Sequence, residues 1–250
     1  MELKLLHMYH DVMDLYGDKG NIRSFQYRCE QRGIDFIYDT CGIGEEKPFW
    51  DYDLLFMGGG ADLEQLILSK DLLTKREGLK KAYEEKTFFL LICGAYQLFG
   101  RYYVNAEGEK IPGLGFFDYV TEAAENHQRC IGNIYLEVRA GEHHFDVLGF
   151  ENHGGQTRGA GVEERPFAKV IFGNGNRYGA KEEGYLEETV IGTYVHGPLL
   201  PKNPELADYI IGRALAKRHG RVDLQPLDDS MERMAKQELL NNLGRERIAF

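Results

Sequence analysis

Segments with the pattern of buried strands alternate with segments of helical periodicity through the first hundred residues. The stretches LKLLHMY, IDFIYD, YDLLFMGGG and TFFLLIC have strand character, and GNIRSFQYRCEQRG and ADLEQLILSKDLLTKREGLKKAYEEK have helical spacing. The longer helical stretch is expected to form two helices, with a break near Thr74 or Gly78. Parallel strands need long crossover connections, which helices usually supply. The sequence therefore predicts an α/β fold, a mostly parallel sheet flanked by helices.

The pattern changes after Gly100, where short β-rich runs separated by turn residues replace the long alternation. GFFDYVTEA, CIGNIYLEVRA, FDVLGFEN and FAKVIFGNG predict an additional antiparallel β portion at about 116–180. ETVIGTYVHG predicts one further strand, and NPELADYIIGRALAKRHG a helix that begins at Asn203 and Pro204. We expect a single domain over residues 1–250, with a C-terminal helical extension at about 221–250.

Charge and hydropathy exclude several classes of function. The 250 residues carry a formal net charge of −10 and no dense basic run, which disfavours a nucleic-acid partner. The apolar runs are too short to cross a bilayer, and the N-terminal stretch mixes acids with apolar residues and has no small-residue cleavage site. We therefore expect a cytoplasmic protein with no transmembrane segment.

Four cysteines, Cys29, Cys41, Cys93 and Cys130, include no C-x-x-C pair, so neither a metal site nor a disulfide framework is expected. Cys93 differs from the others because it ends the apolar run FFLLI and is followed by Gly94 and Ala95. A thiol at a sharp strand-to-helix turn is suited to be a nucleophile, and the helix start favours its thiolate. The alternative is a buried structural cysteine, and position alone favours neither. Packing is the better interpretation for the other three.

A base for such a nucleophile would be a histidine, and two of the eight have a suitable setting. His153 in GFENHGGQT and His196 in TYVHGP both follow strands and precede flexible turns, and the residue pattern does not choose between them. The glycines of MGGGAD allow backbone N–H groups to face a site, as an oxyanion hole requires. They are equally compatible with a tight turn capped by Asp62. No Lys-Ser/Thr pair follows, so this is not a phosphate-binding P-loop.

Six motifs in order, YGDKGNIRSF, MGGGAD, ICGAYQLFG, PGLGFFD, GFENHGGQTR and TYVHGPLLPKNPELAD, give the chain a family resemblance. It resembles the class I glutamine amidotransferases of the cobyric acid synthase-like branch, and within them the glutaminase subunits that act in lipid II amidation. The resemblance runs from about residue 9 to about residue 220. It implies the amidotransferase-like fold and a glutaminase activity.

The resemblance also implies roles for individual residues. Cys93 matches the nucleophile that attacks the side-chain amide of L-glutamine, and His196 matches the general base and later acid. The N–H groups of Gly59 and Gly94 match the oxyanion hole, and Arg129 matches an arginine that holds the substrate. A guanidinium can grip a carboxylate through two hydrogen bonds.

This chain departs from the family pattern near both reactive residues. Leu91 and Ala95 stand where many relatives have glycine, and Pro198 stands where many class I enzymes have the glutamate that completes a catalytic triad. The third member of the triad is left unassigned, and we expect weak glutaminase activity until a partner docks, unless an acid elsewhere in the chain completes the site.

The resemblance implies that this chain carries no cofactor and that ATP is used by a partner, a Mur-ligase-like subunit in a heterodimer. That subunit would use the released ammonia to amidate the D-glutamate α-carboxylate of lipid II. One alternative is a glutaminase subunit serving another acceptor such as a corrinoid, although the N-terminal P-loop domain of the fused corrinoid amidases is not expected here. Others are a catalytically silent binding subunit and a cysteine peptidase on a related scaffold.

Overall fold

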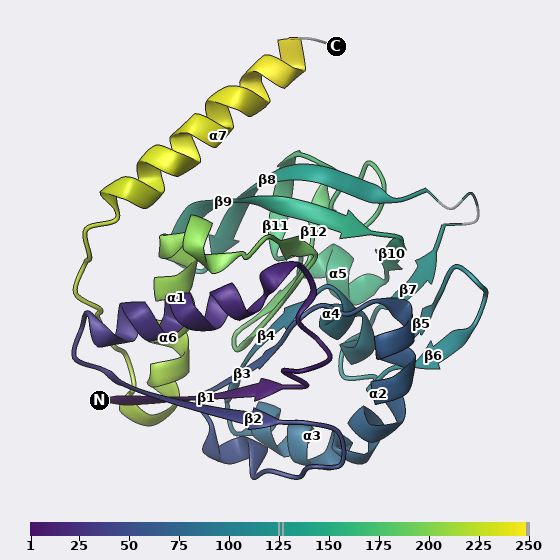
Figure 1. Ribbon diagram of the computed structural model, residues 1–250, viewed down its shortest axis with the longest axis horizontal. Helices are drawn as coiled ribbons and strands as arrows, with labels where there is room; N and C mark the ends of the chain where they lie inside the picture. The colour runs from purple at the N-terminus through teal and green to yellow at the C-terminus, as the bar shows by residue number, and fades with distance from the viewer. Residues whose placement is uncertain (125, 127, 249–250) are drawn as a thin grey trace.

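The computed structural model describes residues 1–124, 126 and 128–248, and Figure 1 shows a layered α/β body from which the last helix extends. The helices are α1 (Lys19–Glu30), α2 (Asp62–Thr74), α3 (Arg76–Glu84), α4 (Gly94–Phe99), α5 (Ala160–Glu164), α6 (Pro204–His219) and α7 (Ser230–Ile248). The strands are β1 (Glu2–Met8), β2 (Asp35–Cys41), β3 (Leu54–Met57), β4 (Phe88–Ile92), β5 (Tyr102–Val104), β6 (Lys110–Pro112), β7 (Val120–Ala123), β8 (Cys130–Ala140), β9 (His143–His153), β10 (Gly155–Arg158), β11 (Ala168–Phe172), β12 (Glu182–Glu183), β13 (Tyr185–Glu187), β14 (Val190–Thr193) and β15 (Val195–His196).

The central sheet has the strand order β13-β14-β4-β3-β1-β2, and all its pairs are parallel except the edge pair β13–β14. Every residue of β3 and β4 is buried, as expected for parallel strands covered on both faces. Helices α1 and α6 pack against each other and against this sheet (Figure 1). The predicted α/β fold is confirmed, and the expected break in the second helical stretch falls between α2 and α3.

The predicted antiparallel portion is confirmed but is larger than expected. The long hairpin β8–β9 is the centre of an antiparallel sheet with the order β12-β11-β8-β9-β15. A small mixed sheet has the order β10-β7-β5-β6, in which β5 and β7 are parallel. The antiparallel pair β5–β6 lies before the predicted β portion at about 116–180 and was not expected. Helix α4, which precedes it, has only six residues.

The segment predicted as one strand at 188–197 is two strands in two different sheets, which corrects that prediction. Strand β14 pairs with β4 in the central sheet, and β15 pairs with β9 in the antiparallel sheet. The chain crosses between the sheets at Tyr194, whose N–H donates to a side-chain oxygen of buried Glu183 at 2.7 Å. The Thr193 hydroxyl donates to the same carboxyl group and accepts the N–H of Val195 at 3.1 Å. Side chains thus replace the ladder hydrogen bonds that the crossing interrupts.

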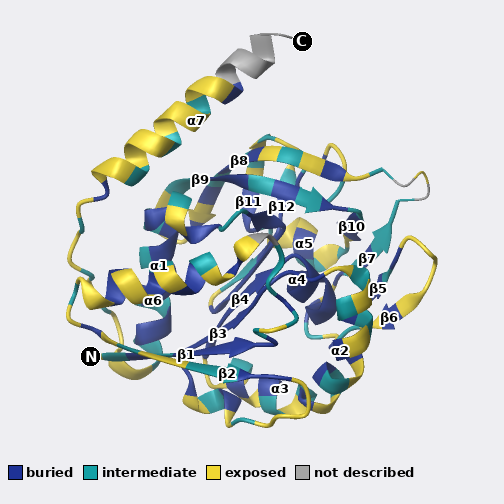
Figure 2. Cartoon of the chain, in the orientation of Figure 1, coloured by how far each residue is buried: buried dark blue, intermediate teal, exposed yellow. Residues whose placement is uncertain are grey.

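Helix α7 leaves the body, and most of its surface is exposed in Figure 2. An ion cluster holds the chain just before it. Buried Arg28 of α1 donates to Asp208 of α6 at 2.6 Å and to Asp229 at 2.7 Å. Among the described residues, no helix has the length and apolar character needed to span a membrane. Residues 249–250 of the predicted C-terminal extension lie outside the described part of the chain.

Glu183 makes the stability of the fold depend on pH. Burial raises the pKa of its carboxyl to about 8, so the fold favours the protonated form. The contribution of Glu183 to the free energy of unfolding is therefore fully present below its pKa in the unfolded chain, near 4.5. It is lost as the pH rises through its folded-state pKa of about 8. Glu183→Gln should flatten this profile. Between pH 5 and pH 8, the free energy of unfolding of the variant should gain at least about 1 kcal/mol on that of the parent.

Urea denaturation of both proteins at pH 5 and pH 8 measures this difference. Glu163→Gln, a change on an exposed residue of α5, is the matched control and should leave the pH profile unchanged. Parallel profiles for the parent and Glu183→Gln would show that this carboxyl does not control the pH dependence.

Candidate active site

Cys93 occupies a strained turn at the end of β4. Its backbone has φ 49° and ψ −102°, a region that residues other than glycine rarely adopt and that costs on the order of 1–3 kcal/mol. Its N–H donates to the carbonyl of Thr193 at 2.8 Å, and its carbonyl accepts the N–H of Gln97 at 3.0 Å. The turn directs the side chain into a cavity of about 610 Å³ that it helps to line. The sharp strand-to-helix turn is therefore present at this cysteine.

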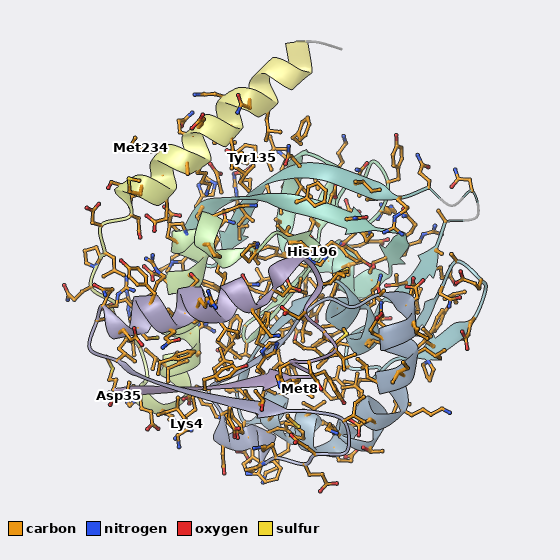
Figure 3. All side chains as sticks on the ribbon, in the orientation of Figure 1. Lys4, Met8, Asp35, Tyr135, His196 and Met234 are labelled. Atoms are coloured by element: carbon orange, nitrogen blue, oxygen red, sulfur yellow. The ribbon has the colours of Figure 1, made fainter. Side chains whose placement is uncertain are left out.

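His196 lies beside this turn because β15 pairs with β9. The residue is fully buried, and Figure 3 shows it near the N-terminal end of α1. Its Nδ1 is 3.6 Å from Oδ1 of Asp18, which is also fully buried. Burial lowers the pKa of His196, but the negative charges and hydrogen bonds of Cys93 and Asp18 outweigh it and raise the pKa to about 10. The imidazolium form of His196 is therefore favoured at physiological pH.

His153 has the opposite electrostatic setting, although it lines the same cavity. Its Nδ1 donates to the carbonyl of Gly155 at 2.7 Å, and its ring stacks on Tyr194 with centroids 3.6 Å apart. Burial lowers its pKa to about 3, so it is neutral at physiological pH. Of the two histidines that the sequence left open, only His196 has neighbours, Cys93 and Asp18, that raise its pKa above the ordinary value.

The triple-glycine segment approaches the reactive pair closely. A Cβ added to Gly59 would lie 2.8 Å from Cε1 of His196 and 3.4 Å from Cβ of Cys93, so only glycine fits there. The N–H of Gly59, predicted to face an oxyanion, instead donates to Oδ2 of Asp18 at 2.7 Å. Gly60 lines the cavity, and its N lies 3.1 Å from the position that a Cβ on Gly94 would take. The Gly60 nitrogen therefore lies close to Gly94, whereas the N–H of Gly59 is taken up by Asp18.

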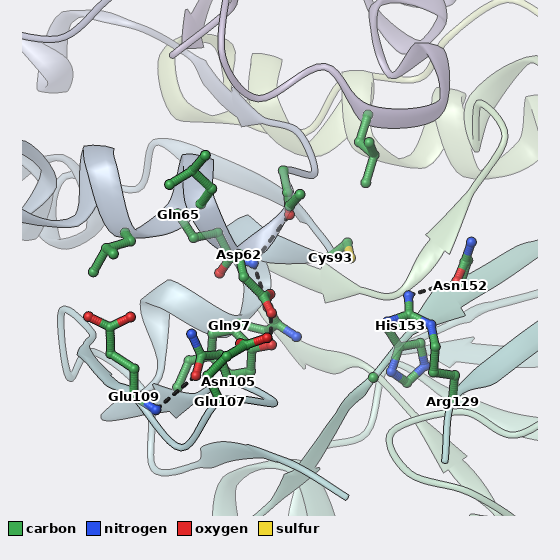
Figure 4. Close-up of a pocket in the computed structure, with 17 residues that line it drawn as sticks. Asp62, Gln65, Cys93, Gln97, Asn105, Glu107, Glu109, Arg129, Asn152 and His153 are labelled. Carbon is green, nitrogen blue, oxygen red and sulfur yellow. Dashed lines mark hydrogen bonds between the residues drawn. The ribbon is translucent and has the colours of Figure 1, made fainter. Parts of the chain in front are cut away.

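Arg129 stands on one side of the cavity and acidic residues stand on the other, with Cys93 between them (Figure 4). The Arg129 guanidinium donates to Oδ1 of Asn152 at 2.9 Å, which fixes it against β9. The acids are Asp62 at the start of α2 and Glu107 and Glu109 in the β5–β6 connection. The cavity is thus polarised from cationic to anionic.

Several polar residues of this site were missed by sequence reasoning. Gln65 donates to the Gly60 carbonyl at 3.2 Å and to Gln97 at 3.0 Å, which braces the glycine segment against α4. Asp18 lies in the YGDKGN motif, which carried the family resemblance but no assigned role. The motif was the only available signal, because the partners of Asp18 are distant in the sequence.

The other cysteines, Cys29, Cys41 and Cys130, are buried in the described structure. Burial raises the pKa of Cys29 to about 12 and those of Cys41 and Cys130 to about 11. These thiols are therefore protonated and packed, in agreement with their interpretation as structural residues.

Solved structures of low sequence identity share this fold. The glutaminase domain of Trypanosoma brucei CTPS with bound acivicin matches 90% of this chain and 96% of that one, with a TM-score of 0.58 and 10% identity. A second structure, described as a glutamine amidotransferase, matches 84% of this chain and 98% of that one, with a TM-score of 0.51 and 17% identity. These likenesses define the class of fold as that of the amidotransferase glutaminases.

Sequence comparison gives the family. Residues 4–204 match the CobB/CobQ-like glutamine amidotransferase domain, so the chain belongs to that family. A lipid II isoglutaminyl synthase (glutamine-hydrolyzing) subunit GatD from Staphylococcus aureus is 35% identical over 98% of both chains. The same-named subunit from Streptococcus pneumoniae is 35% identical over 95% of this chain and 90% of its own. A probable cobyric acid synthase from Methanococcus maripaludis is 28% identical over 73% of this chain but only 35% of its own length.

The site predicts that Cys93 is the most reactive of the four thiols. A glutamine-mimicking electrophile should label Cys93 and leave Cys29, Cys41 and Cys130 unmodified in the folded protein, because those three are buried and protonated. Peptide mass spectrometry after labelling identifies the modified residue. Cys93→Ala should abolish labelling without loss of fold, and comparable labelling of a second cysteine would contradict the assignment.

Proposed function

We propose that this chain hydrolyses L-glutamine to glutamate and ammonia, with Cys93 as the nucleophile and His196 as the acid–base residue. The Cys93 thiolate attacks the side-chain amide carbon and forms a C–S bond, while the carbonyl π electrons move to oxygen. The imidazolium of His196 then donates its proton to the departing nitrogen. The C–N bond breaks, ammonia is released, and the acyl group remains on Cys93 as a thioester. Water, deprotonated by His196, attacks the thioester, which releases glutamate and restores the thiolate–imidazolium pair.

The observation that carries this proposal is the pairing of a strained, cavity-facing cysteine with a histidine whose pKa is raised. The thiolate, not the thiol, is the nucleophile, and a neighbouring imidazolium stabilises it. The strain at Cys93 is consistent with a role, because surrounding structure must hold such a backbone in place. A silent binding subunit would need neither feature.

The developing oxyanion would be stabilised by two backbone amides. We assign these to Gly94, which follows the nucleophile, and to Gly60, since the N–H of Gly59 is donated to Asp18. Two N–H donors aimed at a tetrahedral oxygen are a typical source of catalytic power in acyl transfer. This assignment moves the predicted second donor by one residue.

Substrate recognition fits the polarity of the cavity. Free glutamine is a zwitterion, so its binding site needs a cationic group for the α-carboxylate and an anionic group for the α-ammonium. Arg129 supplies the first, and Asp62, Glu107 and Glu109 surround the second position on the far side of Cys93 (Figure 4). A peptide substrate would lack one or both of these charges, which argues against a cysteine peptidase.

We propose further that the ammonia passes to a Mur-ligase-like, ATP-dependent partner that amidates the D-glutamate α-carboxylate of lipid II. The support is the near-complete coverage of two relatives that are named as subunits of lipid II isoglutaminyl synthase. The cobyric acid synthase relative is matched over about a third of its length, which makes a corrinoid acceptor the weaker alternative. Cytoplasmic localisation, where lipid II precursors are assembled, is part of this proposal.

Reconstitution tests the whole proposal. The chain should co-purify with a Mur-ligase-like subunit, and the complex should convert lipid II to its isoglutamine form with glutamine and ATP. The measurement is the mass of the amidated product, with the glutaminase rate of the chain alone and in complex recorded in parallel. Glutamine hydrolysis without lipid II amidation would retain the glutaminase and overturn the acceptor, whereas an equal rate in both states would refute activation by the partner.

Arg129→Ala should raise the KM for glutamine roughly 10- to 150-fold, from the about 1.5–3 kcal/mol of a charge-assisted hydrogen bond, with a smaller effect on kcat. Free ammonia should still support amidation by the complex, and Arg129→Lys should rescue poorly because a point charge cannot grip a carboxylate at two positions. Arg139→Ala, an exposed change near the other end of β8, is the control. Unchanged glutamine kinetics in Arg129→Ala would contradict the role.

A further inference from the structure

We propose that Asp18 is the positioning residue of this active site and takes the place of the acid that is absent at Pro198. This inference rests on the proposed glutaminase chemistry and names the group that orients its base. The carboxylate of Asp18 is fully buried between two partners. Its Oδ1 faces Nδ1 of His196 at 3.6 Å, and its Oδ2 accepts the N–H of Gly59 at 2.7 Å.

The chain is packed so that Asp18 reaches His196 from the start of α1. A Cβ on Gly20 would lie 2.4 Å from Cγ of Pro198, so these two residues are in direct contact. The N–H of Leu200 donates to Oδ1 of Asn21 at 2.8 Å. The first turn of α1 is therefore fixed against the loop that follows His196. Pro198 stands where many relatives have a glutamate two residues after the histidine. It packs instead against the first turn of α1, the helix that has Asp18 at its start.

The start of α1 also favours a negative charge at Asp18. The aligned peptide dipoles of a helix give its N-terminus a partial positive charge, and α1 has 12 residues. The Gly59 N–H adds a short hydrogen bond from a second element. An unpaired buried carboxylate would be costly, so these contacts with His196 and Gly59 are what hold it in the interior.

Asp18 joins the two halves of the proposed catalytic machinery. With Nδ1 directed at Asp18, Nε2 is the nitrogen left to exchange the proton with Cys93 and the departing ammonia. The carboxylate stabilises the imidazolium without itself taking the proton. Through Gly59 the same carboxylate anchors the segment that presents Gly60 beside Gly94. One side chain thus orients the base and the proposed oxyanion donors together.

The other titratable groups around His196 come from several elements. Cys93 lies at the end of β4, and His153 of β9 and Glu183 of β12 act on His196 electrostatically. Lys202 lies next to Gly197, with its Nζ 3.2 Å from the position that a Cβ on Gly197 would take. All of these remain in an Asp18 variant, so a difference from the parent reports on Asp18.

Asp18→Asn in the full chain tests the proposal. The glutaminase kcat should fall by about 10²- to 10⁴-fold, since the amide cannot stabilise the imidazolium, while the KM for glutamine changes little. Asp14→Asn is the matched control: Asp14 also accepts a hydrogen bond from the start of α1, at Lys19, but it lies at the surface. An unchanged kcat in Asp18→Asn, or an equal loss in Asp14→Asn, overturns the proposal.

Alkylation of Cys93 by iodoacetamide separates positioning from a structural role and does not depend on glutamine. Loss of the acid disfavours the thiolate–imidazolium pair, so the rate at neutral pH should fall about tenfold or more and its pH profile should move to higher pH. A lower melting temperature with an unchanged profile would overturn the role. If the parent hydrolyses no glutamine in complex with its partner, the proposed function fails, while this profile still reports on Asp18.

Should Asp18→Asn not fold, proton NMR of the parent decides. A proton on Nδ1 of His196 that is shared with a carboxylate should give a strongly deshielded resonance that is missing from His196→Gln. The proposal would be overturned if the Nδ1 proton of His196 resonated where an imidazolium bonded to water does. It would also be overturned if the spectra of the parent and of His196→Gln showed the same deshielded resonances.

Discussion

The backbone of Cys93 is held in a left-handed conformation, and the reactive geometry follows from that constraint. The cost of such a conformation for a residue with a side chain is met by its surroundings. Strand β4 is buried along its whole length, and the hydrogen bond from the Cys93 N–H to Thr193 ties the turn to the neighbouring strand. If the turn relaxed to an ordinary φ, the sulfur would no longer face the cavity, and the proposed amides of Gly60 and Gly94 would lose their common target.

A second constraint places the histidine. The chain leaves the central sheet after Thr193 and joins β9 through Val195 and His196, so one crossing connects the two sheets and carries the base. Buried Glu183 satisfies the backbone at that crossing. The nucleophile and the base therefore belong to different sheets, and their approach depends on how the sheets are joined, not on either sheet alone.

The sequence patterns predicted the elements that local periodicity specifies. The strand that ends before Cys93, the hairpin strand beginning at Cys130 and the helix beginning at Pro204 were all located correctly, because burial along each segment determines them. The crossing at Tyr194 was not predictable, since the run ETVIGTYVHG has uninterrupted strand character. The role of Asp18 was also not predictable, because Asp18 contacts His196 only through tertiary packing. The expected spacing for an acid after the histidine pointed to position 198, which is a proline.

The four thiols of this chain should differ in their susceptibility to oxidation. Sulfur oxidation follows access and thiolate character, and Cys29, Cys41 and Cys130 are sealed in the interior as neutral thiols. Cys93 opens onto the cavity, with no second cysteine among the other residues that line it to trap a sulfenic acid as a disulfide. Mild peroxide stress would therefore inactivate the enzyme by oxidising a single sulfur atom, that of Cys93, and leave its fold intact. Recovery would depend on reductants from outside the chain.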